Sequence, residues 1–147
     1  MVLAHALLGI LLGSSAATAA NPYFEVGATF TPPARSGGEG SIDVLFTPLD
    51  PDVLINEEPA VRLKLDPTQV VLVARAKPTP PPSGETDPSK SRYVDLAKPV
   101  HFPVTIAPTA PRGTWDLGAT VVYFFCSKRE GWCRRGTAEV RVSVTVP

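Results

Sequence analysis

The sequence predicts an all-β protein, an immunoglobulin-like antiparallel β-sandwich of about seven or more strands. Short segments repeatedly alternate apolar and polar residues, which is the period of a strand with one buried face. The chain of 147 residues contains 17 prolines and 11 glycines, a composition that disfavours long helices. Apolar residues make up 44% of the chain, enough for the core of one domain.

Four alternating segments mark strands in the first part of the chain: residues 23–30, 42–46, 61–65 and 100–106. A further strand is expected at residues 70–74, which are apolar throughout. Residues 53–56 form a further short apolar piece. Proline, glycine and aspartate place turns between them, at residues 32–33, 35–40, 48–52, 66–67 and 107–113. Residues 77–98 are rich in proline, serine, threonine and charge, so we expect a long irregular loop that is the most mobile part of the mature chain.

The last third of the chain predicts a β-hairpin. Nearly every residue of 117–125 is apolar, which indicates a strand buried on both faces. Residues 137–146 alternate strictly, with valines on one face and Glu139 and Arg141 among the polar residues on the other. Between the two strands, residues 127–132 supply charge and a glycine, the composition of a hairpin loop.

The only two cysteines, Cys126 and Cys133, lie at the two ends of this loop. Opposite Cβ atoms in a hairpin are about 4.5–5.5 Å apart, and a disulfide needs about 3.5–4.5 Å. The two thiols therefore come close to bonding geometry as soon as the hairpin forms. We expect the functional site of the chain at this place.

The first residues of the chain are expected to lie outside the fold. An apolar stretch at residues 6–12 leads into small residues, and Ala17-Thr18-Ala19 fits a signal-peptidase site. The sequence thus divides into a signal peptide, residues 1–19, and one periplasmic or secreted domain, residues 20–147. The alternative is a short hydrophobic anchor or a buried N-terminal segment, although a membrane span needs ~20 apolar residues. In an oxidising compartment the two cysteines are expected to pair.

Composition and motifs disfavour several classes of function. The 14 basic and 14 acidic residues cancel, which argues against nucleic-acid binding. Phosphate-binding, hydrolase and zinc-protease motifs are absent, and no cofactor is expected. His101, the one histidine of the mature chain, is expected on the surface, and with two distant cysteines it makes a poor metal site. Trp115 is expected in the core, whereas Trp132 lies beside Cys133 in a charged loop.

The cysteine pair has two interpretations, and the residues alone leave both open. As a structural staple it would close a small loop and stabilise the fold by roughly 2.5 kcal/mol. As a redox-active pair it would exchange with a partner, because nearby cations stabilise a thiolate. The cations of the loop and its flanks are Lys128, Arg129, Arg134 and Arg135, against the single acid Glu130. On the structural interpretation these charges only solvate the hairpin tip.

The segment VVYFFCSKREGWCRRGTAEVRVSV resembles the cysteine hairpin of the N-terminal periplasmic domain of the thiol:disulfide interchange protein DsbD and its relatives. In that family an apolar strand ends near a first cysteine, a short loop leads to a second, and a valine-rich strand follows. LINEEPAVRLKLDP and HFPVTI resemble two earlier segments of the family. The resemblance covers residues 22–147 and is strongest over residues 117–146.

The resemblance implies an immunoglobulin-like sandwich that accepts electrons through a membrane partner and passes them to periplasmic thiol proteins. Carried over residue by residue, it makes Cys126 and Cys133 the exchange pair. No transmembrane or thioredoxin-like domain follows in this chain, so the electron donor is expected to be a separate protein. The family shields its cysteines with an aromatic residue of a mobile loop; Tyr93 is the candidate for that role, with Trp132 as a second aromatic. The alternative function is a non-enzymatic interaction module with a structural disulfide.

Overall fold

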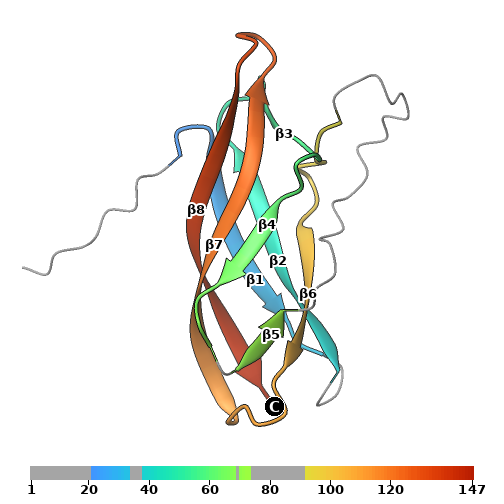
Figure 1. Ribbon diagram of the computed structural model, residues 1–147, viewed down its shortest axis with the longest axis vertical. Helices are drawn as coiled ribbons and strands as arrows, with labels where there is room; N and C mark the ends of the chain where they lie inside the picture. The colour runs from blue at the N-terminus through green and yellow to red at the C-terminus, as the bar shows by residue number, and fades with distance from the viewer. Residues whose placement is uncertain (1–20, 34–37, 69, 74–91) are drawn as a thin grey trace, which may run out of the picture.

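The structure, a computed structural model, describes residues 21–33, 38–68, 70–73 and 92–147. Within these ranges the chain forms strands and no helix (Figure 1). The strands are β1 (Phe24–Thr31), β2 (Glu39–Pro48), β3 (Val53–Ile55), β4 (Arg62–Leu65), β5 (Val71–Val73), β6 (Val100–Ile106), β7 (Gly113–Ser127) and β8 (Cys133–Val146). The predicted signal peptide, part of the first turn and residues 77–91 of the long loop lie outside the described residues.

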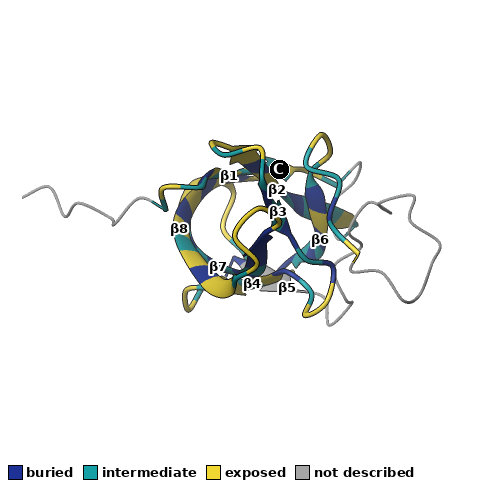
Figure 2. Ribbon diagram, turned by 90° about the horizontal axis from the view of Figure 1, so that it is seen from above, coloured by how far each residue is buried: buried dark blue, intermediate teal, exposed yellow. Residues whose placement is uncertain are grey.

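The strands form two antiparallel sheets packed face to face (Figures 1 and 2). The first sheet has the order β1-β2-β6-β5. In the second, β8 pairs with β7 from Gly113 to Cys126. β8 occupies one edge of β7, so β3 and β4 both pair with the opposite edge of β7, where they lie end to end. The predicted fold class, an antiparallel β-sandwich, is confirmed.

The alternating apolar positions of the sequence build the core between the sheets. The buried side chains include Ile42, Val44 and Phe46 of β2, Val100, Phe102, Val104 and Ile106 of β6, and Val140, Val142, Val144 and Val146 of β8. Successive side chains of a strand point to opposite faces, so one face of each strand enters the core and the other meets solvent. This alternation also fixes the register, because a slip by one residue would expose the whole apolar set.

The prediction that residues 117–125 are buried on both faces is wrong. The odd-numbered positions of this segment of β7 are buried, whereas Gly118, Thr120, Val122 and Phe124 are partly exposed. The outer face of a sandwich sheet has no second layer over it. The apolar residues there are covered only in part, by side chains of the neighbouring strands.

Two further expectations about the ends of strands are corrected. Trp115, expected in the core, is 37% exposed. It lies near the start of β7, where its Nε1 donates to the carbonyl oxygen of Pro111 at 3.0 Å, so the indole covers the preceding turn. Glu39 and Gly40, expected in a turn, belong to β2 because they pair with Thr105 and Val104 of β6.

Candidate functional site

Cys126 at the end of β7 and Cys133 at the start of β8 are joined by a disulfide with an S–S distance of 2.08 Å. The two residues are direct cross-strand partners. In the next pair outward, the Ser127 N–H donates to the Trp132 carbonyl oxygen at 2.9 Å. The cysteines therefore occupy a non-hydrogen-bonded position, where opposite Cα atoms approach closest, and their Cα atoms are 4.0 Å apart. The predicted pairing is confirmed.

The hairpin loop is held by its own backbone and by the turn between β2 and β3. The Ser127 carbonyl oxygen accepts from the Gly131 N–H at 2.9 Å, and Gly131 has a φ of 71°, a conformation that glycine adopts without steric cost. The Lys128 N–H donates to the Asp52 carbonyl oxygen at 3.0 Å. Arg129 pairs with Asp52 at 3.0 Å and with Asp50 at 3.8 Å. The predicted cation Arg129 therefore anchors the loop and is paired with two carboxylates.

The register places the disulfide on the outer face of the sheet. Phe125 and Ser127, the neighbours of Cys126 in β7, are both buried, so the Cys126 side chain points away from the core. Leu54 of β3 is the other cross-strand partner of Cys126, so Cys133, Cys126 and Leu54 form one row across three strands. Cys126 is 8% exposed, whereas Cys133 is exposed to solvent. The bond can therefore be reached from the Cys133 side.

Among the residues that the structure describes, the other three predicted cations form no ion pair with a carboxylate. Lys128 lies over the ring of Tyr93, with its Nζ 4.9 Å from the ring centroid. Arg134 lies over the ring of Trp132, with its Cζ 4.3 Å from the centroid. Arg135 is exposed, and it has no ion pair with any other described residue. Three of the four predicted cations thus lie at the disulfide end of the hairpin without a carboxylate partner among the described residues.

The two aromatic candidates lie on opposite faces of the sheet. Tyr93 forms an isolated antiparallel bridge with Asn56, which in turn donates its N–H to the Phe124 carbonyl oxygen at 2.9 Å. This row lies next to that of the cysteines on the outer face. Trp132 belongs to the core side: its ring centroid is 5.3 Å from that of Tyr23 and 5.8 Å from that of Phe125. Of the two, Tyr93 shares the face of the disulfide.

Three residues of this face were not predicted for the site. Leu54 and Asn56 belong to a segment that the sequence marks only as a short apolar piece, and Phe124 belongs to a strand predicted to be buried on both faces. Leu54 and Phe124 present partly exposed apolar surface beside the cysteines. The Asn56 Oδ1 atom is buried and accepts no hydrogen bond from a described residue. The position of Asn56 follows from its register with Phe124, which no local pattern of the sequence contains.

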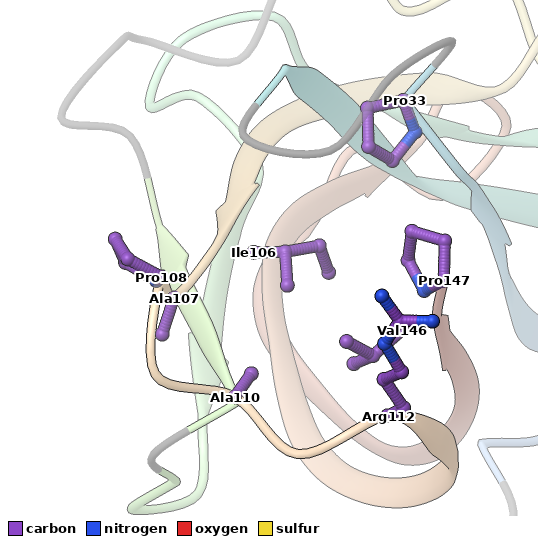
Figure 3. Close-up of a pocket in the computed structure, with 8 residues that line it drawn as sticks. All are labelled: Pro33, Ile106, Ala107, Pro108, Ala110, Arg112, Val146 and Pro147. Atoms are coloured by element: carbon purple, nitrogen blue, oxygen red, sulfur yellow. The ribbon is translucent and has the colours of Figure 1, made fainter.

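A pocket of about 210 Å³ lies at the other end of the sandwich. It is lined by Pro33, Ile106, Ala107, Pro108, Ala110, Arg112, Val146 and Pro147 (Figure 3). Val146 and Cys133 are the two ends of β8, so this pocket is separated from the disulfide by the length of the strand. It is not part of the cysteine site.

Other kinds of site find little support in the described ranges. None of these residues forms a helix long and apolar enough to cross a membrane. In the same ranges, no three side chains among His, Cys, Asp and Glu gather closely enough to hold a metal ion. Comparison of the chain with protein-family models and with curated proteins gives no match. The geometry of the disulfide hairpin is therefore the basis on which the function is inferred.

Proposed function

We propose that this chain is a periplasmic or secreted thiol–disulfide exchange domain in which Cys126 and Cys133 are the reactive pair. The observation that carries the proposal is the position of the bond. It lies on the outer face of a sheet at the end of a hairpin, with Cys133 exposed. Exchange requires that a partner thiolate reach one of the two sulfur atoms, and this position permits it.

The exchange begins at the exposed cysteine. A partner thiolate attacks Sγ of Cys133, the bond between the two cysteines breaks, and its electron pair leaves with Cys126 as a thiolate. The product is a mixed disulfide between Cys133 and the partner. A second thiolate of the partner then attacks the partner's sulfur in that bond and releases Cys133 as a thiolate. The partner leaves as a disulfide and the domain is reduced; the reverse sequence passes the two electrons on.

Three further observations support this proposal. Lys128, Arg134 and Arg135 carry positive charge near the bond, and cations stabilise the thiolates that exchange produces. The pattern of residues 1–19 supports export to an oxidising compartment, where disulfides persist. The resemblance to the N-terminal domain of DsbD supports a thiol–disulfide exchange protein or a membrane electron donor, on a separate chain, as the partner.

The reduction potential of the pair tests the proposal. Exchange proteins have potentials of about −270 to −120 mV, and structural disulfides typically lie below about −300 mV. We expect a glutathione redox titration of the purified protein to give a value in the first range. Neutral substitution of Lys128, Arg134 and Arg135 should lower it, because the thiolates of the reduced state lose stabilisation. A value below about −300 mV that these substitutions leave unchanged would refute exchange.

The second candidate is a non-enzymatic interaction module with a structural disulfide. The near burial of Cys126, which is 8% exposed, favours it, because exchange would release Cys126 as a thiolate and burial disfavours that charge. The same titration separates the two functions.

A further inference from the structure

The disulfide lies on the outer face of the second sheet. There the strand register aligns outward-facing residues of neighbouring strands in rows. Beside the row of Cys133, Cys126 and Leu54 lies a second row, composed of Arg135, Phe124, Asn56 and Tyr93. Phe124 and Leu54 are partly exposed, so the centre of this face is apolar. Arg135 stands at one end of the second row. At the other end stands Tyr93, with the Lys128 ammonium over its ring.

Acidic side chains from the hairpin loop and from the adjoining turn and strand end have partners other than Lys128 and Arg135. Asp50 and Asp52 pair with Arg129, Glu57 pairs with Arg92, and Glu130 accepts a hydrogen bond from Trp132 Nε1. Glu130 is thereby directed to Trp132, which packs on the core side of the sheet. The surface that an incoming thiol meets is therefore apolar at its centre and cationic at both ends.

We propose that this face selects a partner protein whose thiol is flanked by carboxylates, and that Lys128 and Arg135 are the selecting charges. The inference rests on the proposed exchange function and adds the chemistry of the partner. A thiolate carries negative charge itself, and flanking Asp or Glu residues would place further anions next to the two cations. Complementary charge of this kind accelerates encounter and suppresses partners of the wrong sign.

The test compares short thiol peptides that differ only in their flanking charge. The peptides are acetylated and amidated Ser-Glu-Cys-Glu-Ser, Ser-Lys-Cys-Lys-Ser and Ser-Gln-Cys-Gln-Ser. Each is mixed in excess with the oxidised protein, and formation of the mixed disulfide is followed by acid quench and mass spectrometry. Rates are expressed per concentration of thiolate, because flanking charge alters the fraction of each peptide that is ionised. At low ionic strength we expect the acidic peptide to react about tenfold faster than the basic one, and the difference to disappear at about 1 M salt.

Two double variants of equal net charge locate the effect. In K128Q/R135Q the preference for the acidic peptide should fall to about threefold or less. In the control K64Q/R112Q it should remain, because Lys64 pairs with Thr120 farther along β7 and Arg112 lines the pocket at the far end. Exchange that proceeds without a preference, or with one that K128Q/R135Q retains, overturns this inference and leaves the proposed function standing. Absence of exchange with all three peptides overturns both.

Discussion

At the scale of single residues, Gly136 and Tyr123 constrain each other across the hairpin. They are direct partners across β7 and β8. Tyr123 is fully buried, and a Cβ atom at Gly136 would lie 2.6 Å from both Cε2 and Cζ of its ring. The tyrosine ring therefore occupies the space that any side chain at position 136 would need. Glycine is required here for its size, since its φ is not in the left-handed region.

We predict that Gly136→Ala destabilises the protein by about 1–3 kcal/mol, the usual cost of overpacking a core. The free energy of unfolding, measured by urea denaturation, reports the change. The matched control is Gly27→Ala in β1, where a new Cβ atom would meet nothing within 4 Å. Equal stability of the two variants would show that Tyr123 can move aside without loss.

At the scale of elements, Asp43 links three strands on the outer face of the first sheet. Its Oδ1 atom accepts hydrogen bonds from His101 Nδ1 of β6 and from Ser41 Oγ, both at 2.7 Å. Its Oδ2 atom accepts one from Thr31 Oγ1 of β1 at 2.8 Å. The expectation that His101 lies on the surface is confirmed, with 55% of its side chain exposed. Burial opposes ionisation of Asp43, but the three hydrogen bonds outweigh burial and lower its pKa.

This lowered pKa predicts a dependence of stability on pH. The stabilisation is present above the unfolded pKa of about 3.9 and is lost as the pH falls through the lower folded value. Asp43→Asn should therefore cost about 1–2 kcal/mol at pH 7, and the difference from wild type should shrink towards pH 2. Urea denaturation at both pH values measures it. Asp116→Asn, which removes the exposed pair with Arg141, serves as a control and should change little.

The hairpin of β7 and β8 is held by more than its disulfide. The two strands pair along their whole length, and their buried valines lie in the core. We predict that Cys126→Ala with Cys133→Ala lowers the free energy of unfolding by about 2.5 kcal/mol and leaves the register intact. Reduction of the wild type should give the same loss, and reduction of the variant none. Loss of amide protection along all of β7 in the native variant would mean that the disulfide, and not the core, maintains the hairpin.

At the scale of the whole molecule, an aromatic cluster joins the two sheets near the hairpin end of the sandwich. Tyr123 of β7 contacts Phe24 of β1 and Phe46 of β2, with ring centroids 5.9 and 5.1 Å apart. Its hydroxyl accepts a hydrogen bond from Asn21 Nδ2 at 2.6 Å, which ties the start of the described chain to the core. Burial raises the pKa of Tyr123 against the smaller opposing effect of this hydrogen bond.

The raised pKa of Tyr123 predicts a loss of stability at alkaline pH. Its contribution is complete below the unfolded value of about 10 and is lost as the pH rises through the higher folded value, because the unfolded state then ionises first. Tyr123→Phe should cost about 1 kcal/mol at pH 8, where Asn21 loses its partner, and should weaken the decline above pH ~10. Unfolding free energies of both proteins from pH 8 to 12 test this. If the unfolding free energy of the variant declined equally steeply, the decline would have to come from groups other than Tyr123.

Local patterns in the sequence predict most of the strands, the buried faces of β2 and β6, and the cysteine pairing. Alternation is local and can be read along the chain, as in β2 and β6, where every predicted core position is buried. The disulfide was equally predictable because its partners are only seven residues apart, at the ends of one hairpin loop. For the same reason the four cations could be placed near the bond.

Which face of the sheet carries the bond, and which nearby charges are paired, follow from the tertiary contacts of the described residues. Tyr93 reaches that face through Asn56, and Arg129 is paired with Asp50 and Asp52 from another turn. The link between Asp43 and His101 spans 58 residues. These contacts depend on the order and register of strands, which are set when the two sheets pack. A local pattern holds no information on them, because the same alternation is compatible with many strand orders.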